Sequence, residues 1–115
     1  MCQIVFLQRP ERLTEARWLE VWHDSHTQIA IGTQSTFVYR QNVITKSFSD
    51  DAPVLHAMIE ESFPPQAMTS DRAFYGVDND EDLKINQTAM IESCARFIDF
   101  DKIDVIPMSE YIFTR

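Results

Sequence analysis

The residue best suited to acid–base chemistry is His26, because of the apolar side chains spaced around it. It lies in segment 14–31, where hydrophobic residues recur at helical spacing. Trp18, Trp22 and Ile29 fall on the same face and could line a pocket. Burial there lowers the pKa of an imidazole and favours the neutral form, which can act as a general base. The alternative is a core histidine that is bonded to a backbone carbonyl.

A second histidine, His23, lies three residues before His26. This spacing permits two imidazoles to share a metal ion, but the sequence has no HExxH motif and offers no third ligand. We therefore expect no metal site. His23 falls at the rim of the apolar face, where it either contributes to a ligand pocket or is a solvated surface histidine.

These side chains must be positioned by a mixture of strands and helices. The residue types predict strands over 2–8, 35–46 and 104–114 and helices over 14–31, 64–74 and 81–98. Gly32 and Gly76 are expected to follow the ends of the first two helices. Pro107 predicts an edge position or a bulge for the last strand, since proline cannot donate to the ladder. Residues 54–63 fit a strand or a helix equally well.

Composition narrows the range of functions. The 115 residues are enough for one domain, 1–115, and the formal net charge is −8. An acidic chain repels phosphate groups, which argues against nucleic acid and anionic membranes as partners. The two cysteines form no CxxC motif, and no apolar stretch approaches the roughly 20 residues of a membrane span. We therefore expect a cytoplasmic protein with reduced thiols.

Several short motifs occur in an order that is similar to a known family. Trp22 is followed four residues later by His26, and a strand then carries Tyr39 followed by Gln41 and Asn42. Near the end, Phe97-Ile98-Asp99 precedes a strand with Glu110-Tyr111-Ile112. The chain resembles the EthD family of the dimeric α/β-barrel superfamily over nearly its whole length.

The resemblance implies an α+β fold, a ferredoxin-like split β-α-β sandwich in which 54–63 is a strand. The sheet would be antiparallel with helices on one face, and two copies would pair as a dimeric α/β barrel. Strand 2–8 agrees with this homodimer because it is apolar on both faces. Such a strand should be buried on both sides, by the helices on one and by the second copy on the other. Glu110 interrupts the last apolar segment, so it should be exposed or paired with an arginine such as Arg40.

The resemblance also implies roles for individual residues. His26 would be the base, and Tyr39 or His56 would donate to a developing oxyanion. Tyr39 could instead be a packing residue, and His56 could lie in the barrel interface. Trp18, Trp22, Ile29 and His23 would contact the substrate.

We expect an enzyme that transfers protons on a small apolar carbonyl, lactone or aromatic compound, without a cofactor, in a catabolic or ether-degrading oxidative pathway. Its class would be isomerase, lyase or cofactor-independent oxygenase. The alternative is a non-catalytic binding protein for an apolar metabolite. Haem binding is a third reading, which the acidic composition disfavours because haem propionates need basic partners.

Overall fold

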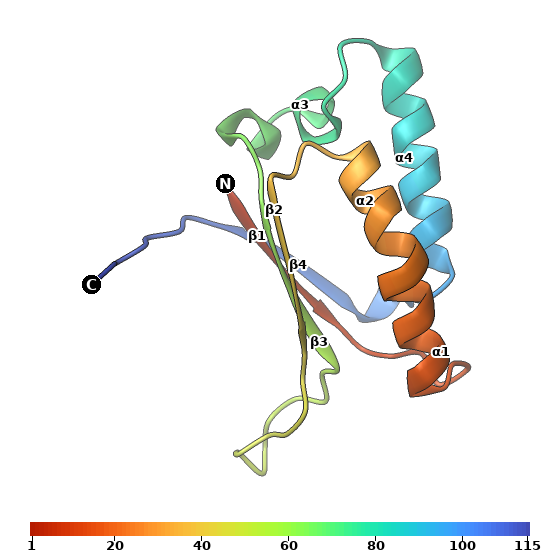
Figure 1. Ribbon diagram of the computed structural model, residues 1–115, viewed down its shortest axis with the longest axis vertical. Coiled ribbons are helices and arrows are strands. Elements are labelled where there is room, and N and C mark those ends of the chain that lie inside the picture. Colours follow the sequence, from red (N-terminus) through yellow and green to blue (C-terminus); the bar gives the residue numbers. More distant parts are fainter.

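In the computed structural model, which describes residues 1–115, one four-stranded antiparallel sheet carries its longer helices on one face (Figure 1). The strands are β1 (Cys2–Leu7), β2 (Val38–Val43), β3 (Ala57–Ser62) and β4 (Ile103–Met108). Their order is β2-β3-β1-β4, so β3 lies between β1 and β2. This is the split β-α-β order of a ferredoxin-like sandwich. The predicted fold class is confirmed, as is a strand within 54–63.

The strand register sorts the side chains into rows that face the helices. Cross-strand neighbours form three such rows: Leu7–Ala57–Val43, Val5–Ile59–Gln41 and Gln3–Glu61–Tyr39. The core is built on the first two rows, where Val5, Leu7, Ala57 and Ile59 pack against Trp18, Val21, Trp22, Phe97 and Ile98. The third row is polar although it is equally covered. This contrast along one sheet face marks the third row as unusual.

The first helix is continuous but changes its hydrogen bonding partway. It consists of α1 (Glu15–Glu20), the π-helical turn η1 (Val21–His26) and α2 (Thr27–Thr33). Thr14 caps its start by accepting a bond from the Arg17 N–H at 3.2 Å. Within η1 the bonds span five residues, as from the Thr27 N–H to the Trp22 carbonyl, which adds a residue to the turn. Positions after Trp22 are therefore rotated relative to a regular α-helix.

The remaining helices connect β3 to β4. They are the 3-10 turn η2 (Pro65–Met68), α3 (Asp71–Tyr75), α4 (Asp80–Ala95) and the 3-10 turn η3 (Phe100–Lys102). Gly76 follows α3 with φ 63°, which confirms its predicted role. Gly32 does not have that role, because it lies inside α2 and the helix continues to Thr33.

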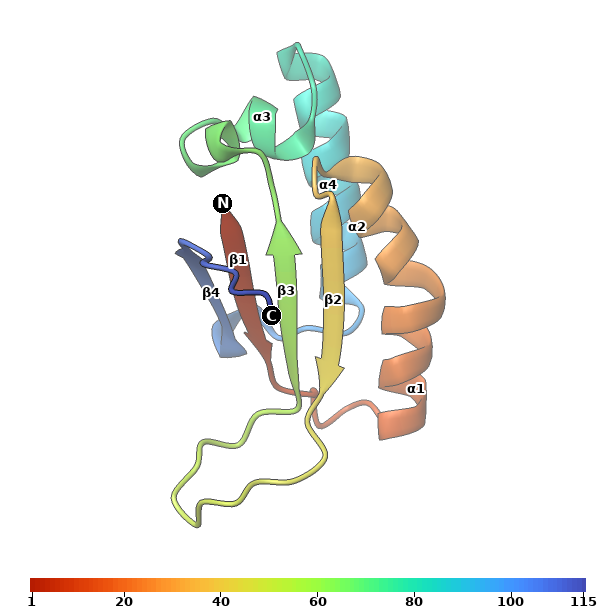
Figure 2. The same cartoon turned by 60° about the vertical axis from the view of Figure 1, so that its left-hand side comes forward.

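The face of the sheet opposite the helices, called the open face here, carries Cys2, Ile4 and Phe6 of β1 with Ile106 and Met108 of β4. No helix covers it, and only the C-terminal segment 109–115 crosses it (Figure 2). The last strand is shorter than predicted because Met108 pairs with Cys2, the first residue of β1, and no partner remains beyond it. As Pro107 predicts, β4 is an edge strand.

Candidate functional site

A cavity of about 330 Å³ opens where α1 begins, beside the ends of β1 and β2. Its lining joins four polar or charged side chains to an apolar wall: Arg9, Glu15, Thr45 and His56 with Trp18, Val43 and Ile44. Trp18 is only 1% exposed and forms the back of the cavity. Two predicted site residues, Trp18 and His56, thus meet here, and we call this the α1 cavity.

His56 is held in a defined orientation immediately before β3. Its backbone bridges two strands, because its N–H donates to Leu7 and its carbonyl accepts from Ile44, both at 2.9 Å. Its Nδ1 accepts a bond of 2.8 Å from the Arg9 N–H, and its ring meets Trp18 edge-on at 6.3 Å. A neutral imidazole whose Nδ1 accepts carries its proton on Nε2. His56 therefore offers a fixed N–H donor.

The charged groups of the α1 cavity are a carboxylate and a guanidinium. Glu15 lies in the first turn of α1 and is exposed. Arg9 is half-buried and donates through Nη1 to the Leu13 carbonyl, which fixes the loop between β1 and α1. A hydrogen-bond donor and a proton acceptor beside an aromatic wall are the elements needed for proton transfer on a small carbonyl compound.

A second polar feature lies deeper under the helices, at the row Gln3–Glu61–Tyr39. Glu61 is 6% exposed, forms no ion pair, and accepts one bond of 2.9 Å from the Gln3 amide. Burial raises the pKa of its carboxyl to about 7, and the Gln3 bond opposes this only in part. Burial also raises the pKa of Tyr39, against the effect of the nearby Trp22 and Gln41 side chains. Glu61 can therefore exchange a proton near neutral pH.

The helical side of this row is less fully bonded. The indole Nε1 of Trp22 is buried and has no hydrogen-bond partner of ordinary geometry, although the Tyr39 side chain lies beside it. Burial, followed by the charge of Glu61, raises the pKa of the Cys94 thiol to about 11. Cys94 is therefore held as an uncharged thiol and is no activated nucleophile.

His26 lies between the first helix and α4. Its Nδ1 is 2.8 Å from the Ser93 hydroxyl, its ring packs against Phe97 at 4.6 Å, and it is 4% exposed. Burial, followed by the positive charge of Arg96, lowers its pKa to about 4. His26 lines none of the larger cavities. The π-helical turn gives the reason, since it rotates residue 26 from the face of Trp22 toward α4.

The remaining predicted contact residues do not join the α1 cavity. His23 is exposed and packs its ring on Trp22 at 4.8 Å. Ile29 lines a groove between α2 and α4. Sequence reasoning missed Arg9, Glu15 and Glu61. Glu61 carried a signal only as one of two adjacent acidic residues in segment 54–63, which does not tell it from Glu60.

No group of three or more His, Cys, Asp or Glu side chains is arranged to hold a metal ion. None of the helices is both long enough and apolar enough to span a bilayer. No known protein family matches the chain, and no curated protein is detectably similar to it in sequence. The geometry of the site is therefore the main guide to function.

Proposed function

We propose that the chain is an enzyme that transfers protons on a small apolar carbonyl, lactone or aromatic compound bound in the α1 cavity. The observation that carries this proposal is the lining of that cavity, where the His56 imidazole and the Glu15 carboxylate stand beside Trp18. The resemblance to the EthD family supports the same class of small-molecule chemistry. In this reaction His56 donates a hydrogen bond to the oxyanion, and Glu15 is the general base, the role predicted from the sequence for His26.

The proposed reaction moves one proton. The substrate lies against Trp18 and Ile44, and its carbonyl oxygen accepts a hydrogen bond from His56 Nε2–H. The Glu15 carboxylate removes a proton from the carbon next to the carbonyl, and the electron pair of that C–H bond moves onto the oxygen as an enolate. The His56 donor stabilises the enolate. Return of the proton to a different carbon completes an isomerisation.

Hydrogen–deuterium exchange tests this activity. A panel of apolar ketones and unsaturated lactones is incubated in D2O with the protein, and loss of C–H signals is followed by proton NMR. We expect exchange of at least one compound to be accelerated. His56→Phe should abolish the acceleration, whereas the matched variant His23→Phe, at an exposed histidine, should retain it.

Two results contradict the proposal. Exchange that survives His56→Phe places the chemistry elsewhere. Retention of a small molecule in native mass spectra, without exchange of that molecule or of the panel, favours the non-catalytic binding protein.

The partner we propose is a second copy of the chain, paired through the open face. Ile106 and Met108 are 45% and 38% exposed there, and Tyr111, Ile112 and Phe113 of the C-terminal segment are 77% exposed or more. Burial of these side chains would supply the apolar contact of a stable interface, of at least about 1,000 Å² in total. Both cysteines are free, which suits a reducing compartment such as the cytoplasm. A monomer in sedimentation at micromolar concentration contradicts the dimer.

A further inference from the structure

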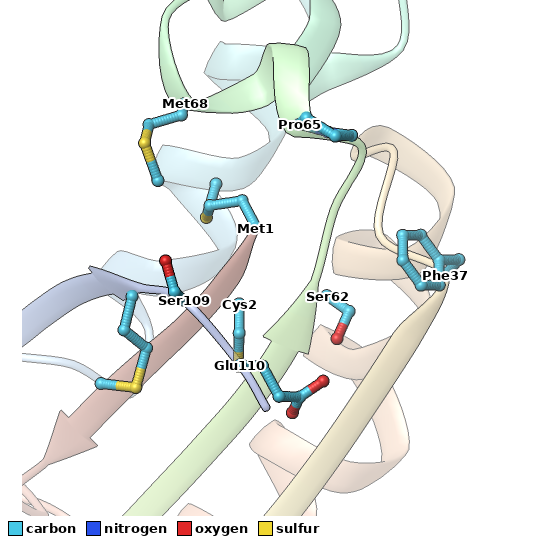
Figure 3. A pocket seen from close by; sticks show the side chains of 9 residues that line it. Met1, Cys2, Phe37, Ser62, Pro65, Met68, Ser109 and Glu110 are labelled. Carbon is cyan, nitrogen blue, oxygen red and sulfur yellow. The ribbon is translucent and has the colours of Figure 1, made fainter. Parts of the chain in front are cut away.

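A second cavity, of about 450 Å³, lies on the open face at the end of the sheet near the N-terminus (Figure 3). Its walls come from both ends of the chain and from the segments before β2 and after β3. The lining residues are Met1, Cys2, Phe37, Ser62, Pro65, Met68, Met108, Ser109 and Glu110. This cavity is separate from the α1 cavity, since no residue lines both.

The lining is unusually rich in sulfur. The chain has five methionines and two cysteines, and four of these seven side chains line this one cavity. Cys2 and Met108 are direct cross-strand partners on the open face, so their Cβ atoms are about 5 Å apart. Figure 3 shows the Met1 and Met68 side chains next to one another on one side of the cavity, apart from the Cys2 thiol. Methionine side chains have three rotatable bonds and can converge on a common point.

Two carboxylates, Glu110 and Glu60, place negative charge near Cys2, and the N-terminal ammonium opposes it in part. The expected ion pair between Glu110 and Arg40 is not formed, and Glu60 forms none either. Carboxylates without ion pairs favour a cation placed beside them.

We propose that this cavity binds a soft monovalent metal ion of the Cu(I) class through Cys2 and Met108, with thioether ligands from Met68 and Met1. Thiolate and thioether sulfur are the ligands that select Cu(I). On binding, the S–H bond of Cys2 breaks, its proton leaves to solvent, and the thiolate bonds the metal. The thiolate carries the one negative charge that neutralises the monovalent ion. The proposal is independent of the reaction proposed for the α1 cavity.

The donor set also predicts selectivity. The cavity has one carboxylate, two serine hydroxyls and no histidine, which is a poor ligand set for Mg²⁺, Ca²⁺ or Zn²⁺. Oxidation to Cu(II) should weaken binding, because that ion prefers nitrogen and oxygen ligands in a tetragonal arrangement.

Anaerobic titration of the full chain with Cu(I), in competition with bicinchoninate, measures the site directly. We expect one equivalent bound per chain, an X-ray absorption spectrum with sulfur as the nearest neighbours, and loss of that equivalent in Cys2→Ser. Met108→Leu should weaken binding. Cys94→Ser and Met90→Leu alter sulfur side chains under the helices and should bind as the unmodified chain does.

NMR of the methionine methyl groups tests the same site in the unmodified chain, where no substitution can affect folding. Addition of Ag(I), a redox-inert substitute, should shift the methyl signals of Met68 and Met108 and leave Met58 and Met90 in place. Absence of binding, or binding unchanged by both Cys2→Ser and Met108→Leu, overturns the proposal. Shifts confined to Met58 or Met90 overturn it as well.

Discussion

Each face of the sheet carries one group of side chains that its surroundings do not suggest. The covered face holds a buried carboxyl, a phenol and an amide in the row Gln3–Glu61–Tyr39, under helices that could have covered apolar residues more favourably. The open face, which no helix covers, places Ile4, Ile106 and Met108 side by side. The covered face thus encloses one polar row beside its apolar core, and the open face exposes Ile106 and Met108 although it also carries Arg40, Asn42 and Glu60.

This contrast separates two tasks. Burying an unpaired carboxyl costs folding free energy, so its presence under the helices indicates a role other than stability. Apolar side chains exposed together on a sheet, as Ile106 and Met108 are, are typical of a contact surface. We therefore assign the proposed chemistry to the covered side of the sheet and the proposed contact with a second copy to the open face. The predictions below test this division, from the largest expected effect to the smallest.

Truncation of a large side chain should have very different effects on the two faces. Trp22 is fully buried under the helices, and Trp22→Ala should lower the free energy of unfolding by about 3–5 kcal/mol. Ile106→Ala on the open face should cost less than about 1 kcal/mol in the separated chain, because its side chain is already 45% exposed. Urea unfolding at low protein concentration measures both. Equal losses would mean that the faces do not differ.

Two adjacent glutamates provide a sharper comparison. The pKa of Glu61 is raised to about 7 in the fold, so its stabilising contribution is complete below its unfolded pKa of 4.5 and is lost as the pH rises through 7. Glu61→Gln removes this loss and should raise the free energy of unfolding at pH 8 by about 3 kcal/mol, but not at pH 4.

The control is Glu60→Gln, one residue earlier and on the open face. Glu60 is half-exposed and accepts a bond of 3.2 Å from Asn42. Its replacement should change stability by less than about 0.5 kcal/mol at either pH. A similar gain in both variants would show that the effect comes from net charge and not from burial.

His26 should produce the opposite pH dependence. Its pKa is lowered to about 4, so between pH 6.5 and 4 the unfolded chain binds a proton that the folded chain does not. The free energy of unfolding is therefore unaffected by this group above the unfolded pKa of 6.5 and falls as the pH is lowered toward 4. Between pH 4.5 and 6.5 this opposes the effect of Glu61. In a Glu61→Gln background, stability should fall by about 1.5 kcal/mol from pH 6.5 to pH 5. Adding His26→Gln should remove that fall, and a fall that persists would mean that another group titrates.

The two glycines should respond in opposite directions. A Cβ added at Gly32, inside α2, meets no atom within 4 Å. Gly32→Ala should therefore stabilise α2 and raise the free energy of unfolding by up to about 1 kcal/mol. Gly76 has φ 63°, and Gly76→Ala should destabilise by about 1 kcal/mol. Thermal unfolding resolves both shifts. Stabilisation by both would show that the conformation at Gly76 is not required.

Local sequence rules predicted β1, β2 and β4, the first helix and the turn at Gly76, because side-chain alternation and a left-handed glycine act over a few positions. They did not decide between strand and helix for 54–63, and the predicted helix 64–74 is divided into η2 and α3. The π-helical turn at Val21–His26 was not predictable from the sequence. It contains one residue more than a turn of α-helix, and tertiary packing decides which of the two forms. The site was predicted only in part. Trp18 and His56 lie in one cavity, but Arg9 and Glu15 are brought beside them by the loop between β1 and α1, whose path depends on tertiary contacts. To predict that Glu61 is buried, one must know which face of β3 meets the helices.

The most direct test asks which face accepts a small apolar carbonyl compound. Cyclohex-2-enone is titrated into the unmodified protein while the imidazole protons of all three histidines and the methionine methyl groups are followed by NMR. We predict that the His56 signals move in a saturable way, together with the indole of Trp18, while those of His23 stay in place. Shifts at Met68 and Met108 without any change at His56 or Trp18 would place the ligand on the open face and contradict the division of tasks.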